Sequence, residues 1–212
     1  MKHTVILQPG EDRPSPFSAH RPDEPVTDAD TALRYLRDGN QRYIQHRTLP
    51  SQTDPEQWKQ LALNPQYPFA VVVTCADSRV LPELFFDLRM GDIFVVRHPG
   101  NTADRTTLGA VEYGVACLSV PLIVVVGHSC CGAVTAAFDG GEYPEYLQEI
   151  LTSIQANIGG QPNLDCAIHT NVACAVAEIR RNAVVQKAGT RVVGAYFDIA
   201  TGVVTWSEGA PL

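Results

Sequence analysis

Two valine-rich apolar runs constrain the fold of this 212-residue chain more than any other feature. The runs are Pro68–Thr74 and Pro121–Gly127, and neither alternates apolar with polar residues. Strands that are buried on both faces of a parallel sheet have this composition. Each run is followed by polar and reactive side chains, and open α/β sheets place their functional sites at the carboxyl ends of the strands. We therefore expect two strands whose ends meet at one site.

Helical and strand patterns alternate along the rest of the chain. Further strands are expected at 91–97, 191–198 and 203–206, and helices at 28–38, 41–45, 55–63, 82–87, 107–118, 131–138, 143–158 and 165–187. Gly39-Asn40 is expected to end the first helix, and Gly189 to close the last one. This order predicts an α/β fold with a mainly parallel central sheet flanked by helices and with an N-terminal helical arm.

No repeat or internal linker divides the sequence, so a single α/β domain is expected over residues 28–212. Residues 1–27 contain five prolines and few large apolar side chains, which predicts an extended N-terminal arm.

Composition excludes several classes of function. The net charge of -7 and the absence of a Lys/Arg run argue against a nucleic-acid partner and against an anionic membrane surface. No apolar stretch approaches the roughly 20 residues that span a bilayer. The first residues do not resemble a signal peptide, so a cytoplasmic location is expected. Metal binding or burial is then favoured over disulfides for the six cysteines.

The two strand ends carry residues that suit a zinc ion. Cys75 follows the first run, and His128 and Cys131 follow the second. Zinc prefers thiolate and imidazole ligands in a tetrahedron, and a catalytic site leaves one corner for water. The spacing alone also allows Cys130, but His-x-x-Cys is the usual geometry and Gly132 permits close backbone approach. We therefore favour Cys75, His128 and Cys131 as the ligands.

These residues belong to a longer pattern that resembles the β-class carbonic anhydrases. Its core is Cys75-x-Asp77-x-Arg79 followed by His128-x-x-Cys131-Gly132. The likeness runs from about Asp30 to the last strand and includes Val80-x-Pro82-Glu83, Gly91-Asp92-x-Phe94-Val95-Val96-Arg97, Gly109-Ala110-x-Glu112-Tyr113 and Gly127-His128-Ser129.

The resemblance implies one Zn²⁺ per subunit on Cys75, His128 and Cys131. It also implies that Asp77 accepts a hydrogen bond from the water at the metal and helps to remove its proton, while Arg79 pairs with Asp77.

The resemblance further implies a CO2 pocket formed by Gln66, Phe94, Tyr113 and Gly132. On the residues alone, Phe94 and Tyr113 would be core residues and Gln66 a loop residue. In the family these pocket residues come partly from a neighbouring subunit, so a homodimer or a dimer of dimers is implied.

The function implied by the resemblance is the reversible hydration of CO2 to bicarbonate and a proton. Because two thiolates neutralise the charge of the metal, we expect activity to rise towards alkaline pH. One alternative is hydrolysis of COS or CS2, which the unusual loop at His98-Pro99 could favour. His98 itself suits either a proton shuttle or a structural role. The other alternative is a non-catalytic zinc protein, but a structural site needs no Asp77–Arg79 pair and usually has four protein ligands.

Overall fold

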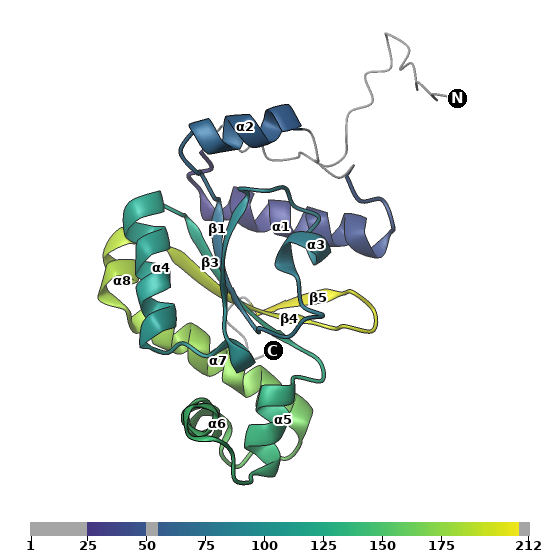
Figure 1. Cartoon of the computed structure of the whole chain (residues 1–212), viewed down its shortest axis with the longest axis vertical. Helices are drawn as coiled ribbons and strands as arrows, with labels where there is room; N and C mark the ends of the chain where they lie inside the picture. Colours follow the sequence, from purple (N-terminus) through teal and green to yellow (C-terminus); the bar gives the residue numbers. More distant parts are fainter. Residues whose placement is uncertain (1–24, 50–54, 208–212) are drawn as a thin grey trace.

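A five-stranded sheet forms the centre of the part of the chain that this computed structural model describes, residues 25–49 and 55–207. The strands are β1 (Ala70–Thr74), β2 (Ile93–Arg97), β3 (Leu122–His128), β4 (Arg191–Phe197) and β5 (Val204–Ser207). They lie in the order β2-β1-β3-β4-β5 (Figure 1), and all neighbours are parallel except β4 and β5. The predicted mainly parallel α/β fold is confirmed.

The two valine-rich runs are the neighbouring strands β1 and β3, and every residue of both is buried. Their register pairs Ala70 with Leu122 and Thr74 with Val126. Cys75 and His128 therefore emerge side by side at the carboxyl edge of the sheet, as the sequence predicts.

Helices cover both faces of the sheet (Figure 1). They are α1 (Ala29–Ile44), α2 (Pro55–Leu63), α3 (Pro82–Phe85), α4 (Arg105–Leu118), α5 (Gly132–Asp139), α6 (Glu145–Ile158), α7 (Leu164–Arg181) and α8 (Ala183–Ala188), with a 3-10 turn η1 at Pro99–Asn101. Side chains of α1 and α3 pack with Val72 and Val124 on one face, and those of α4, α7 and α8 pack with Val71 and Val125 on the other. Helices α5 and α6 extend the core beyond the carboxyl ends of the strands.

The expected end of the first helix at Gly39-Asn40 is wrong, because α1 continues through both residues. A Cβ atom at position 39 would lie 1.7 Å from the Phe86 carbonyl oxygen, so glycine lets α1 approach that backbone. The buried Asn40 amide donates to the carbonyls of Phe85 and Gly202, at 3.0 and 2.8 Å. Gly39 and Asn40 therefore form contacts with distant segments of the chain, and neither residue ends the helix.

The single helix expected over 165–187 is also wrong, because the chain breaks at Asn182. Asn182 has an extended backbone, and its side-chain oxygen accepts hydrogen bonds from the N–H groups of Val184 and Val185, as an N-cap does. A new helix, α8, therefore begins there. The predicted extended arm over residues 1–27 lies outside the described residues except for its last three.

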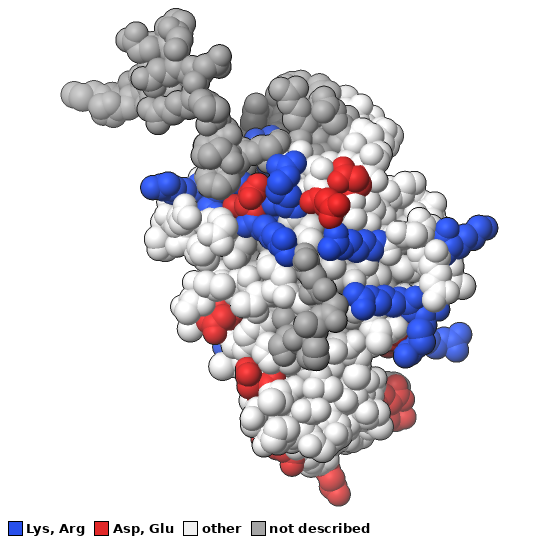
Figure 2. Space-filling view, turned by 180° about the vertical axis from the view of Figure 1, so that it is seen from behind, with Lys and Arg blue, Asp and Glu red and all other residues white. Residues whose placement is uncertain are grey.

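The surface carries charges of both signs. On the face shown in Figure 2, lysines and arginines alternate with acidic side chains in the upper half, and acidic side chains lie at the lower end, around α5 and α6. No helix among the described residues is long and apolar enough to cross a membrane. All six cysteines have free thiols.

Candidate metal centre

Three side chains that favour zinc converge at the carboxyl edge of the sheet. Cys75 directly follows β1, His128 is the last residue of β3, and Cys131 is the N-cap of α5. All three are buried, and their candidate ligand atoms lie within 4.8 Å of one another. The two sulfur atoms are 3.9 Å apart. Of the two cysteines that the spacing left open, this group contains Cys131 and not the exposed Cys130.

The His128 ring is oriented as a metal ligand. Its Nδ1 lies 2.9 Å from the Ser129 carbonyl oxygen, to which it donates as an N–H. Nε2 is buried and has no hydrogen-bond partner among the described residues. A buried nitrogen without a partner costs free energy, and a histidine ligand usually donates its other ring N–H in this way. The lone pair of Nε2 and two sulfur atoms form a donor set that fits zinc.

Hydrogen bonds around the Cys75 sulfur favour its negatively charged thiolate form. The pKa of this thiol is lowered to about 4, mainly by its hydrogen bond with Cys131, with further contributions from His128 and two backbone donors. These donors are the N–H groups of Gly100, at 3.3 Å, and Asp77, at 3.4 Å. The same contact with Cys75 raises the pKa of Cys131, so the two thiols share one proton, which stays on Cys131. A bound cation would stabilise both thiolates and release that proton.

Asp77 and Arg79 form a two-pronged ion pair beside the ligands. Arg79 Nε donates to Asp77 Oδ1 at 2.9 Å, and Nη2 donates to Oδ2 at 2.7 Å. The Arg79 side chain holds the pKa of the Asp77 carboxyl well below its usual range, so the carboxylate is ionised near neutral pH. Arg79 Nη2 also lies 3.3 Å from the Cys130 carbonyl oxygen, which connects the two ligand segments.

Arg97 is a residue for which sequence reasoning found no role. Its Nη2 donates to the Asp77 carbonyl oxygen at 2.7 Å and its Nε to the Cys75 carbonyl oxygen at 3.3 Å. The guanidinium thus holds the backbone between a ligand and the acidic group. Arg97 pairs with Thr74 across β2 and β1, a register that a sequence pattern does not reveal.

The structure favours the structural role of His98. Its Nδ1 lies 2.6 Å from Thr102 Oγ1, and its Nε2 lies 3.1 Å from Asp104 Oδ2. Both ring nitrogens are therefore engaged in holding the loop that follows β2.

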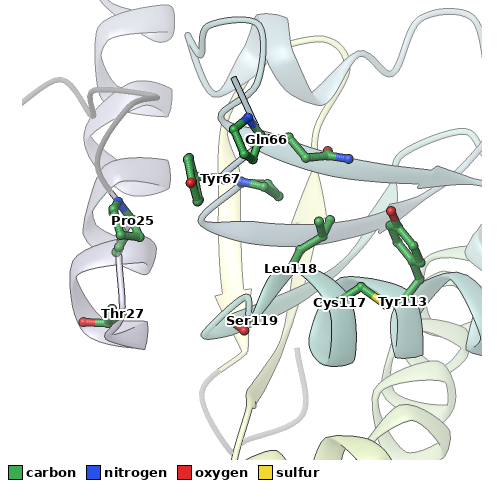
Figure 3. Close-up of a pocket in the computed structure, with 11 residues that line it drawn as sticks. Pro25, Thr27, Gln66, Tyr67, Tyr113, Cys117, Leu118 and Ser119 are labelled. Atoms are coloured by element: carbon green, nitrogen blue, oxygen red, sulfur yellow. The ribbon is translucent and has the colours of Figure 1, made fainter. Parts of the chain in front are cut away.

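The residues predicted to form the CO2 pocket do not all gather around the metal ligands of their own chain. Gly132 adjoins Cys131, and a Cβ added there would have no atom within 4 Å. Gln66 and Tyr113 instead line a cavity of about 480 Å³ with Pro25, Leu118 and Ser119 (Figure 3).

This cavity lies at the amino ends of the strands, since Gln66 precedes β1 and Ser119 precedes β3, whereas Cys75 follows β1 and His128 ends β3. A five-residue strand is about 17 Å long. Phe94, in β2, contacts Tyr113, with ring centroids 5.7 Å apart. Within one chain, three of the four predicted pocket residues therefore group away from Cys75.

The chain is similar to known proteins in sequence and in fold. The carbonic anhydrase family profile matches residues 70–204. The carbonic anhydrase of Mycolicibacterium smegmatis is 39% identical over 187 residues, which cover 82% of this chain and 90% of the relative. A carbonic anhydrase of Pseudomonas aeruginosa is 30% identical, over 84% of this chain and 89% of its own length.

Solved structures show the same fold at lower identity. A β-carbonic anhydrase of Sordaria macrospora, described as tetrameric, superposes with a TM-score of 0.69 and 24% identity, covering 85% of this chain and 98% of its own. A Coccomyxa β-carbonic anhydrase in complex with acetazolamide superposes with a TM-score of 0.65 and 24% identity, over 85% and 86% of the two chains. By its sequence match and by its fold, this chain belongs to the β-carbonic anhydrase family.

Proposed function

We propose that this protein is a zinc-dependent carbonic anhydrase that interconverts CO2 and water with bicarbonate and a proton. The observation that carries this proposal is the convergence of two sulfur atoms and one unpartnered imidazole nitrogen within 4.8 Å, all buried. Three protein ligands leave one position open, which distinguishes a catalytic zinc site from a structural one. The reaction is that of a carbonate dehydratase, a carbon–oxygen lyase.

Cys75, His128 and Cys131 would hold one Zn²⁺ per subunit. When bound, zinc supplies a Lewis acid that makes water a nucleophile near neutral pH. The side chains of this chain orient that water and take its proton. Asp77 suits this role because its carboxylate is ionised, starts two residues after a ligand and is held at both oxygens by Arg79. Arg79 is the positioning residue of the pair.

CO2 is small and apolar, so its pocket needs apolar walls and one donor. The Phe94 and Tyr113 rings can provide walls, and the Gln66 amide can provide the donor. We propose that these three side chains serve the metal centre of a neighbouring subunit, since they lie at the opposite end of the strands from Cys75. The working enzyme is then a homodimer or a dimer of dimers, and Gly132 adds a backbone surface beside the metal of its own subunit.

We place this activity in the cytoplasm. Two of the six free cysteines are needed as thiolates, which suits a reducing compartment.

The test is CO2 hydration and zinc content measured on the same sample. We expect about one zinc per chain and hydration that a chelator removes and added zinc restores. The matched pair of variants is Cys131→Ser, which should lose zinc and activity, and Cys130→Ser, which should keep both. Stoichiometric zinc without hydration would favour a non-catalytic zinc protein, and faster release of hydrogen sulfide from COS than hydration of CO2 would favour the sulfur substrate.

A further inference from the structure

The Gly100 N–H group is aimed at the Cys75 sulfur by an unusual backbone conformation. Gly100 lies in η1 with a φ of 69°, and its N–H donates to Cys75 Sγ at 3.3 Å. A Cβ at this position would lie 2.5 Å from Ile154 Cδ1, so a larger residue would have to displace this buried side chain and adopt a strained positive φ. Glycine is also the residue with the greatest backbone freedom, so the orientation of the Gly100 N–H must be set by the neighbouring residues.

The neighbouring backbone restrains Gly100 from both sides. On the N-terminal side, the ring of Pro99 fixes the φ angle of Pro99 itself. The peptide group that follows Gly100 is held at its nitrogen, because the Asn101 N–H donates to the His98 carbonyl at 3.0 Å. The same peptide group is held at its oxygen by Asn171 of α7, whose Nδ2 donates to the Gly100 carbonyl at 2.7 Å.

Asn171 is itself fixed in a single orientation. It has no exposed surface, and Ile168 and Val172 on the same helix are also buried. Its Oδ1 accepts a hydrogen bond of 3.0 Å from Asn157 Nδ2, on α6. Both ends of the amide are therefore used. A polar side chain placed this deep costs free energy unless it is hydrogen-bonded, and here its bonds lead to the backbone that contacts a metal ligand.

A hydrogen bond to a thiolate withdraws electron density from the sulfur. Hydrogen bonds around a metal ligand thereby tune the metal and hold the ligand in place. We propose that Asn171 is a positioning residue of the metal centre, whose amide keeps the Gly100 N–H on the Cys75 sulfur. This inference rests on the proposed zinc site and adds a residue to it that lies 96 positions after Cys75 in the sequence.

Cobalt(II) bound to the full-length protein in place of zinc is the probe, because thiolate ligands give it a charge-transfer absorption band. Asn171→Leu keeps the branching at Cγ but cannot donate. We expect its band to move to longer wavelength, since a sulfur without the hydrogen bond gives up electrons more easily. We also expect zinc affinity, measured by competition with a chromophoric chelator, to fall about 10-fold or more.

Two further variants separate positioning from packing. Val172→Ala removes a buried side chain from the next position of α7 and should leave the band unchanged. Asn157→Ala leaves the Asn171 donor in place but removes the hydrogen bond that holds the other end of the Asn171 amide. We expect this variant to move the band in the same direction as Asn171→Leu, but by a smaller amount. This variant also decides the question if Asn171→Leu does not fold.

A band and an affinity that match the unaltered protein in the Asn157 and Asn171 variants would overturn the role of Asn171 alone. Absence of the thiolate band in the unaltered protein would overturn the metal centre and this proposal together.

Discussion

The Arg79 side chain donates hydrogen bonds to both carboxylate oxygens of Asp77, at 2.9 and 2.7 Å. Asp77 lies two residues after Cys75, a candidate zinc ligand. This contact decides what the acidic group can do. The ion pair keeps the Asp77 carboxylate ionised and fixes its orientation. Asp77 can therefore accept a proton without binding the metal.

Removing the charge of Asp77 should separate catalysis from metal binding. For Asp77→Asn we expect the zinc content to be unchanged and CO2 hydration to fall by roughly 100-fold or more, since general-base assistance is lost. Stopped-flow hydration and metal analysis on one sample measure both. The variant Asp139→Asn, on an exposed position at the end of α5, is the control and should behave like the unaltered protein. Full activity in Asp77→Asn would mean that another group takes the proton.

Hydration should become faster as the pH rises from 7 to 9. Asp77 does not cause this rise: Arg79 holds the pKa of its carboxyl well below the usual range, so the carboxylate is already ionised throughout this pH interval. The rise comes from the centre itself, since two thiolates make it less acidifying than a zinc on three histidines, for which the pKa of the water is about 7. A pH–rate profile measures this, and a flat profile would contradict a Cys75–His128–Cys131 centre.

Two inactive variants should complement each other if the pocket is shared between subunits. Gln66→Ala would damage the pocket offered to the partner, and Asp77→Ala would remove the proton acceptor beside the metal centre of its own chain. In a mixed dimer one site carries both defects and the other carries none. After unfolding and refolding a 1:1 mixture, we expect about a quarter of the unaltered activity, because half of the dimers are mixed and each has one intact site.

The control for this experiment is the mixture without refolding, in which subunits have not exchanged. Activity no higher than that of the two separate variants would place Gln66 and Asp77 at the same site, or at sites that do not depend on each other.

Because of Asp92, the free energy of unfolding should fall as the pH rises. It is 2% exposed, its Oδ1 has no hydrogen-bond partner among the described residues, and burial raises its pKa to about 7. The folded chain therefore holds this proton more tightly than the unfolded chain, whose carboxyl pKa is 3.8. The stabilising contribution is complete below pH about 4 and is lost towards pH 7, at up to about 1.4 kcal/mol per pH unit.

Asp92→Asn removes this dependence while it can still accept the hydrogen bond from the Arg89 N–H. In urea unfolding at pH 5 and pH 8 we expect the advantage of the variant over the unaltered protein to grow with pH. Asp139→Asn again serves as the control. An advantage of the same size at both pH values would show that Asp92 is not the group that titrates.

Two glycines in helices should respond to alanine in opposite ways. A Cβ at position 39 would meet the Phe86 carbonyl oxygen, so Gly39→Ala should lower the free energy of unfolding by about 2 kcal/mol or more. A Cβ at position 109 of α4 has no atom within 4 Å, so Gly109→Ala should raise it by about 0.5–1 kcal/mol. Thermal or urea unfolding measures both, and equal effects would mean that α1 does not lie against α3 as described.

The strands and the candidate metal group could be predicted from the sequence because their signals are local. An unbroken valine run marks a strand that is covered on both faces, as β1 and β3 are. The residue types that follow each run are those that zinc prefers, so the sequence could predict the edge of the sheet and a candidate metal group there.

What only the tertiary structure decided are the contacts between distant segments. Gly39 and Asn40 have the local preferences of a helix end, but close packing against Phe86 and hydrogen bonds to distant carbonyls keep them inside α1. Cys131 is distinguished from Cys130 by burial, Arg97 reaches the Asp77 backbone because β2 lies beside β1, and Asn171 reaches Gly100 from α7. The free energy of such contacts depends on how the elements pack, and a pattern of neighbouring residues does not contain that information.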